Sequence, residues 1–316
     1  MPLTTFDTVG ILVTGLVAGL FGGLLGVGGS IIMIPALVAF FGQGHRPGYA
    51  GFNQHLYQAA AMIVNIAVAI PATIRHTRAG AVVPRVVRSM LPAALLGVVA
   101  GVWLSNARAF REGMADTPGP VLLGRVMAVF LLYVIVMNIA RMFRRARDPH
   151  APLILRHVSS GRCTGVGLAM GLVAGLLGVG GGALAVPLQQ VVLKLRLRNC
   201  IANSAAVMCF TALVGAVYKN LSLPQHGLAI DRSLLLAALF IPPAVIAAWA
   251  GSHLTHRLPV RLVRGVFILA LAASAWKMAG FGSPPPPDRL AGPTPPTVSL
   301  TADSKRPAPP PPRPRL

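Results

Sequence analysis

The chain consists largely of apolar stretches of about 20 residues, the length of an α-helix that crosses the hydrocarbon core of a bilayer. Only 11% of its 316 residues are charged, and its mean hydropathy is +0.69, whereas a soluble domain carries about 25% charged residues. These features predict an all-α, polytopic bundle of transmembrane helices that lies in a lipid bilayer. They exclude a soluble enzyme, a disulfide scaffold and a disordered protein as descriptions of the whole chain.

Eight apolar spans are expected, and glycines interrupt two of them. The interrupted spans are 9–27, which continues through 31–42, and 163–181, which continues through 183–193. The uninterrupted spans are 56–74, 86–105, 120–141, 200–218, 233–254 and 262–280.

The two interrupted spans share one glycine and proline pattern, which indicates an internal repeat. The first copy reads GLVAGLFGGLLGVGGSIIMIP from Gly15 to Pro35, and the second reads GLAMGLVAGLLGVGGGALAVP from Gly167 to Pro187. Seven Gly and Pro positions coincide at a constant shift, which chance does not readily produce. We therefore divide the chain into a first transmembrane repeat (1–142), a basic cytoplasmic linker (143–162), a second transmembrane repeat (163–280) and a disordered proline-rich tail (281–316).

The sequence GVGG at 26–29, followed by Ser30, predicts a break in the first helix. Each Gly inside a helix costs about 1 kcal/mol relative to Ala, and Pro35 removes a further backbone donor. The same break is expected at 178–182. Broken spans at corresponding positions of two repeats are the best sequence indication of a transporter's binding site.

A short helix that begins at such a break offers free N–H groups and the positive end of its dipole, which suit an anion. The alternative, that the glycines only let helices pack closely, is favoured for the glycines spaced by four in 15–23 and 167–175. The expected backbone cradle is Gly26, Gly28, Gly29, Ser30, Gly178, Gly180, Gly181 and Gly182, with side-chain donors from Asn53, Gln54, Asn203 and Ser204. A dinucleotide-binding loop is excluded, because a long apolar helix precedes the glycines and the third glycine of GxGxxG is missing.

The candidate polar groups inside the predicted spans are neutral, and they include Gln58 and Asn65. Hydrogen bonding between helices is the alternative role for each of them. The acidic residues fall outside the spans or at their edges, namely Asp7, Glu112, Asp116, Asp148, Asp231, Asp288 and Asp303. Because neither an intramembrane carboxylate nor a catalytic carboxylate pair is available, we do not expect an enzyme.

No metal, cofactor or nucleic acid is expected as a partner. The cysteines, Cys163, Cys200 and Cys209, are odd in number and lack the spacing of metal ligands. The net charge of +21 comes from Arg and Lys that lie between apolar stretches. Such loops set the orientation of a membrane protein, and they do not form one basic face for nucleic acid.

The distribution of positive charge among the loops predicts the orientation. The arginine-rich segments 75–88 and 141–162 are expected in the cytoplasm, and the segment 106–116 between them outside. In the second half, 194–198 and 257–264 are assigned to the cytoplasm, and the loop with Lys219 and Arg232 to the outside. This arrangement requires each glycine-broken element to return to its starting side, so the repeats would be inverted. Eight full crossings with parallel repeats is the alternative.

The paired GLLGVGG…P segments resemble the sulfite exporter TauE/SafE family. The resemblance covers nearly all of 9–280, and Ala202-Asn203-Ser204 is similar to the small polar triplet that family members place after the glycine motif. The first half differs there, with Asn53-Gln54-His55. The resemblance implies a multi-pass transporter of the bacterial inner membrane that exports a small sulfur-containing or organic anion, such as sulfite or a sulfonate.

Two functions of different classes therefore follow. The first is a carrier that exposes a site between the glycine breaks alternately to the two sides, with a small anion as its substrate. The second is a non-transporting membrane accessory or scaffold protein that recruits a partner through the proline-rich tail. A homo-oligomer is compatible with either function.

Overall fold

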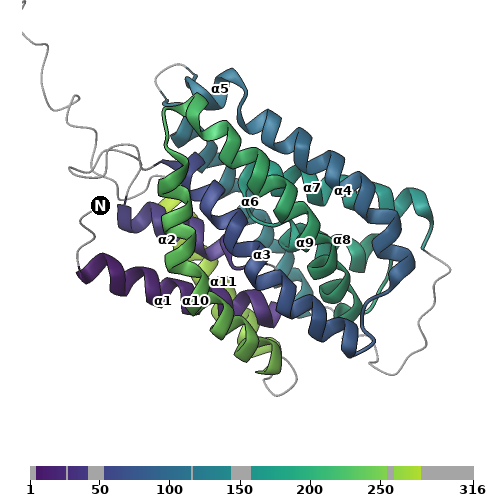
Figure 1. Ribbon diagram of the computed structural model, residues 1–316. Coiled ribbons are helices and arrows are strands. Elements are labelled where there is room, and N and C mark those ends of the chain that lie inside the picture. The colour runs from purple at the N-terminus through teal and green to yellow at the C-terminus, as the bar shows by residue number, and fades with distance from the viewer. Residues whose placement is uncertain are drawn as a thin grey trace, which may run out of the picture. The chain divides into compact units, whose positions relative to one another are not determined.

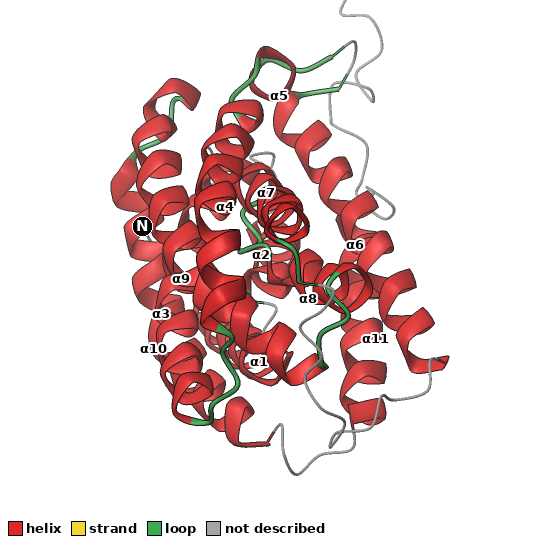
Figure 2. Ribbon diagram, turned by 90° about the vertical axis from the view of Figure 1, so that its right-hand side faces the viewer, coloured by secondary structure: helices red, strands yellow, loops and turns green. Residues whose placement is uncertain are grey.

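A computed structural model describes residues 5–25, 28–41, 53–114, 117–143, 158–254 and 260–278. Within these residues the chain is a bundle of helices without strands (Figures 1 and 2), so the all-α prediction is confirmed. The proline-rich tail, Gly26 and most of the linker lie outside the described residues.

The helix boundaries follow the predicted spans closely. The elements are α1 (Thr5–Leu25), α2 (Ser30–Phe41), α3 (Gln54–Arg78), α4 (Pro84–Ser105), α5 (Arg108–Arg111), α6 (Gly119–Phe143), α7 (Ser160–Leu177), α8 (Gly182–Val192), α9 (Leu197–Ser222), the 3-10 helix η2 (Leu223–His226), α10 (Ile230–Leu254) and α11 (Val260–Met278). Six described helices are long and apolar enough to cross a membrane, namely α3, α4, α6, α7, α9 and α10. The apolar parts of α1, α2, α8 and α11 are shorter.

Glycines hold two pairs of helices in backbone contact. A Cβ atom on Gly19 of α1 would overlap the carbonyl oxygen of Ala244 in α10, and one on Gly171 of α7 would overlap that of Ala94 in α4. The α1–α10 pair is visible in Figure 1 and the α4–α7 pair in Figure 2. The packing role that the four-residue spacing predicts is thus confirmed for these glycines. Each pair joins one helix from each predicted repeat.

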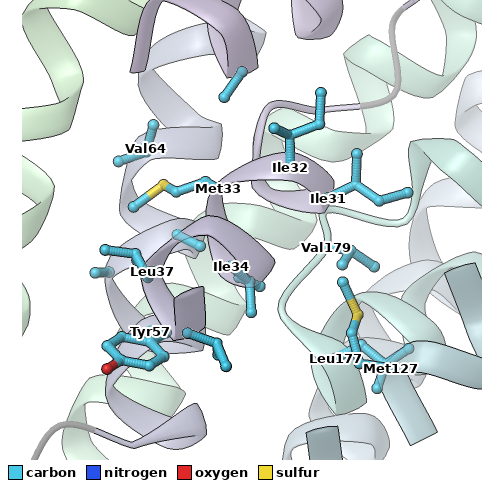
Figure 3. Close-up of a cluster of buried hydrophobic side chains, with 14 of the residues drawn as sticks. Ile31, Ile32, Met33, Ile34, Leu37, Tyr57, Val64, Met127, Leu177 and Val179 are labelled. Carbon is cyan, nitrogen blue, oxygen red and sulfur yellow. The ribbon is translucent and has the colours of Figure 1, made fainter. Parts of the chain in front are cut away.

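The short helix α2 lies inside the bundle rather than on its surface. It contacts α1, α3 and α11, and its side chains share one buried apolar cluster with residues of α3, α6 and the end of α7 (Figure 3). The buried residues of this cluster include Ile31, Met33, Ile34, Leu37, Tyr57, Val64, Met127, Leu177 and Val179. Because α2 is buried almost all round, the chain is held firmly on the C-terminal side of the first glycine break.

Helices α3 and α9 run antiparallel, and their ends define the two ends of the bundle. At the α5 end, at the top of Figures 1 and 2, the Nε2 of His226 lies 2.9 Å from the Oδ1 of Asn106, which follows α4. At the opposite, basic end, Arg198 donates to the carbonyl oxygen of Ala79 at 2.8 Å. Segments 106–114 and 223–232 therefore share one end, and 75–88 and 194–198 share the other. An inverted repeat requires an antiparallel pair of this kind, and the inversion itself stays a prediction.

Candidate functional site

Both predicted glycine breaks are present. Helix α1 ends at Leu25 and α2 begins at Ser30, while α7 ends at Leu177 and α8 begins at Gly182. The backbone between them takes left-handed values, with φ of +86° at Gly28, +72° at Gly178, +69° at Gly180 and +73° at Gly181. A side chain is strained in this region. The glycine sequence therefore ends each helix and turns the chain into the next one.

The two breaks meet at the same two side chains, Asn65 of α3 and Met208 of α9. A Cβ atom on Gly28 would lie 3.1 Å from the Sδ of Met208 and 3.2 Å from the Oδ1 of Asn65. A Cβ atom on Gly180 would lie 2.7 Å from the Sδ of Met208 and 3.0 Å from the Nδ2 of Asn65. The left-handed backbone thus favours glycine at both positions, and a Cβ atom would be tight at Gly28 and would overlap Met208 at Gly180.

Asn65 connects the breaks by hydrogen bonds. Its Nδ2 donates to the Oγ of Ser30 at 2.9 Å and to the carbonyl oxygen of Gly178 at 3.4 Å. The side chain is fully buried, yet its Oδ1 has no partner among the described residues. Buried polar atoms without a partner are rare in folded proteins, and they indicate a bound water or ligand.

Two further carboxamides, Gln54 and Gln58, lie on the same face of α3 as Asn65, because the three are spaced by four and seven residues. Both glutamines are fully buried. Neither side-chain polar atom of Gln54 has a partner among the described residues, and Gln58 has one bond, from its Nε2 to the carbonyl oxygen of Leu176 at 3.3 Å. These carboxamides span about 16 Å along the helix. They form a line of incompletely bonded polar groups from the α5 end to the breaks.

The expected side-chain donors do not gather around the breaks. Asn53 caps α3, and its Oδ1 accepts from the backbone N–H groups of His55 and Leu56 at 3.0 and 3.3 Å. Gln54 begins α3 at the α5 end. Asn203 and Ser204 lie near the start of α9, toward the basic end. Because α3 and α9 run antiparallel, the residues at the start of each helix lie at opposite ends of the bundle. The spacing of residues in the sequence does not reveal this direction.

Asn203 and Ser204 belong to a separate buried network around Gln189 of α8. The Nε2 of Gln189 donates to the Oγ of Ser204 at 2.8 Å, and the Nδ2 of Asn203 donates to the Oε1 of Gln189 at 3.2 Å. The Oδ1 of Asn203 accepts from the backbone N–H of Val83 at 2.8 Å. This network ties α8 and α9 to the loop between α3 and α4.

Two cradle residues, Gly29 and Gly181, lie against the backbone of the preceding helix instead of against Asn65 and Met208, and a third, Gly182, is buried. A Cβ atom on Gly29 would lie 3.0 Å from the carbonyl oxygen of Ala18, and one on Gly181 would lie 2.6 Å from that of Met170. Gly182 is buried as the first residue of α8. Of the twelve expected site residues, the breaks therefore bring together Gly28, Ser30, Gly178 and Gly180.

Lys219 is the functional candidate that the sequence analysis missed. We expected it in an outside loop, but it lies in α9 and is fully buried. Its Nζ donates to the Oγ of Ser105, and it lies 3.2 Å from the Nδ1 of His55. The predicted span ends at residue 218, just before Lys219. Helix α9 in fact continues to Ser222, so the lysine lies inside the helix and not in the loop that follows it.

No carboxylate balances this charge within the described residues. The acidic side chains described there, Glu112 and Asp231, are both exposed. Glu112 accepts from Arg111 at 2.9 Å, and this hydrogen bond lowers the pKa of the Glu112 carboxyl below its usual value. The exposed acids and the buried lysine are thus not partners.

Comparisons with known proteins place these features in a family context. The family model described as "Sulfite exporter TauE/SafE" matches residues 11–278. The chain is 29% identical over 298 residues to a "Probable membrane transporter protein MamO" from Paramagnetospirillum magneticum and 28% identical to the protein of that name from Magnetospirillum gryphiswaldense. The alignments cover 86% of this chain but only 44% and 45% of those proteins. The chain thus spans less than half the length of these curated relatives. No solved structure matches it.

Proposed function

The chain belongs to the sulfite exporter TauE/SafE family, and from this premise we propose that it transports a small anion across the bacterial inner membrane. The substrate class is a sulfur-containing or organic anion, with sulfite or a sulfonate as the first choice. The direction is export, with the basic end of the bundle in the cytoplasm. Transport proceeds by alternating access to a site between the two glycine breaks.

The observation that carries this proposal is the meeting of both breaks at Asn65. Two short helices, α2 and α8, begin there, and their first N–H groups have no partner within their own helix. The positive ends of the two helix dipoles favour negative charge at that place. The Nδ2 of Asn65 adds a side-chain donor. Its unpartnered Oδ1 is an acceptor that suits an oxyanion still carrying a hydroxyl proton, as hydrogen sulfite does.

The polar groups on either side of the breaks suit alternating access. The line of Gln54 and Gln58 leads from Asn65 to the α5 end. Toward the basic end, the network of Gln189, Asn203 and Ser204 holds the loop at Val83 against α8 and α9. In the described conformation the residues around the breaks are buried, which corresponds to an occluded state. Opening toward the cytoplasm requires the bond between Asn203 and Val83 to break.

Flux measurements test this function directly. The purified full-length chain is reconstituted into proteoliposomes, and uptake is followed for radiolabelled sulfite, sulfate, an alkyl sulfonate and a carboxylate. We expect saturable uptake of at least one of the sulfur oxyanions above that of protein-free liposomes. Equal uptake by both kinds of liposome for every anion would contradict the proposed function.

A further inference from the structure

A buried cluster of donors lies at the α5 end of the bundle, apart from the glycine breaks. It consists of Lys219 in α9, His55 at the start of α3, Ser105 at the end of α4 and His226 in η2. The rings of His55 and His226 stack with centroids 3.8 Å apart. Lys219, His55 and Ser105 are fully buried, whereas His226 is partly exposed. The cluster therefore joins the interior of the bundle to its surface at this end.

The hydrogen bonds fix what each group of the cluster offers. The Nε2 of His55 lies 3.1 Å from the carbonyl oxygen of Phe110, which can only accept, so Nε2 carries the proton and Nδ1 accepts from Lys219. The ammonium of Lys219 has three N–H donors, and Nδ1 of His55 and Oγ of Ser105 take two of them. The third N–H has no acceptor among the described residues. The hydroxyl proton of Ser105 also has no acceptor among the described residues.

We propose that this cluster is an anion-binding subsite, which holds a small oxyanion by the third N–H of Lys219 and the hydroxyl of Ser105. The inference rests on the proposed transport function and places a second binding position on the same path. Among the described residues only neutral groups surround this buried cation, which is costly, and an anion relieves that cost. Because Lys219 has no acidic partner among the described residues, its charge also disfavours a cation at this position.

The carboxamides of α3 connect this subsite to the breaks. Gln54 precedes His55 in the chain, Gln58 lies one turn further along, and Asn65 lies about two turns beyond Gln58. All three have side-chain polar atoms without partners among the described residues. An anion that moves from Lys219 to the breaks can thus form hydrogen bonds with each of these carboxamides in turn. Lys219 lies about 16 Å from Met208 along α9, so the subsite is distinct from the breaks.

The kinetic test compares Lys219→Met with Lys194→Met in the sulfite flux assay. Lys194 is exposed near the basic end, so its variant loses the same charge outside the path. We expect Lys219→Met to raise KM for sulfite roughly ten- to hundredfold, since a charge-assisted hydrogen bond is lost. Ser105→Ala should raise KM severalfold, and Lys194→Met should leave it unchanged.

The outcomes separate the subsite from the transport function. A wild-type KM in Lys219→Met, with normal flux, would overturn the subsite and leave the carrier intact. Absence of flux in the wild type would instead contradict the carrier.

Anion binding to the wild-type chain tests the subsite without relying on the folding of any variant. Selenite has the charge and pyramidal shape of sulfite, and selenium is located by anomalous diffraction from crystals soaked in it. We expect a peak within hydrogen-bond distance of the Nζ of Lys219. A peak at the glycine breaks with none at Lys219 would overturn the subsite, whatever the kinetic variants do.

Discussion

Asn65 of α3 donates a hydrogen bond of 2.9 Å to the hydroxyl oxygen of Ser30, the first residue of α2. The same Nδ2 reaches the carbonyl oxygen of Gly178 in the other break, at 3.4 Å. One carboxamide thus bridges two segments more than a hundred residues apart in the chain.

Replacing Asn65 by Leu removes the bridge while keeping the number and branching of the side-chain heavy atoms. We expect the rate of anion uptake to fall at least about tenfold, because both the donor and the unpartnered acceptor are lost. The measurement is flux in proteoliposomes at matched protein content.

Asn138→Leu is the matched control. Asn138 is also buried, but its Nδ2 donates to the carbonyl oxygen of Val134 in its own helix, α6. We expect this variant to keep the wild-type rate within about a factor of two, since that bond contributes roughly 1 kcal/mol or less to stability. Similar rates for both variants would remove Asn65 from the proposed site.

Gly171→Leu tests the close packing of α4 and α7. A side chain at Gly171 would overlap the backbone of Ala94, so the two helices must separate. We expect a loss of stability of about 3 kcal/mol or more, because the overlap is with backbone and cannot be relieved by a rotamer change. Fluorescence-detected size-exclusion chromatography in detergent measures the folded fraction.

Gly165→Leu on the same helix is the control, because nothing lies within 4 Å of a Cβ atom there. It should give the wild-type elution profile. An unchanged profile for Gly171→Leu would show that the described helix contact is wrong.

The orientation is tested by cysteine labelling in a background without the native cysteines. Arg108 of α5 and Arg78 at the end of α3 are both exposed, at opposite ends of the bundle. An impermeant maleimide should label Arg108→Cys in intact spheroplasts, and it should label Arg78→Cys only after the membrane is permeabilised. The opposite labelling pattern would show that the basic end faces the outside and would contradict the proposed orientation.

Most of the helical layout was predictable from the sequence, because each apolar span and each glycine cluster is a local signal. The break at 178–182 is an example, since α7 ends at Leu177 and α8 begins at Gly182. The site was less predictable. The donors Gln54 and Asn203 hold similar places after each motif, yet they lie toward opposite ends because α3 and α9 run antiparallel. Local patterns carry no information on helix direction.

Lys219 shows a second limit of the sequence. A lysine near the end of an apolar stretch is ordinarily a loop or interface residue. Here α9 continues beyond it to Ser222, and His55 and Ser105 from two other helices supply its partners. Such a partner set depends on tertiary contacts between distant segments, which a single sequence does not display.

Deleting 281–316 separates the carrier from the scaffold alternative. All the contacts that support the proposed path lie within 28–226, so we expect the shortened chain to keep wild-type uptake in proteoliposomes. A scaffold that recruits a partner through its proline-rich tail would lose its function on this deletion. Loss of flux in a correctly folded, shortened chain would therefore argue against a self-sufficient carrier.

The most direct test of the central claim is sulfite uptake by the double variant Gly28→Ala/Gly180→Ala beside the control Gly161→Ala/Gly165→Ala. Both control glycines lie in α7 with nothing within 4 Å of a Cβ atom. Alanine at Gly28 and Gly180 meets left-handed backbone and the side chains of Met208 and Asn65. If the anion crosses between the breaks, the folded double variant loses uptake at least about tenfold, while the control keeps it. Wild-type uptake by the folded double variant would contradict the account.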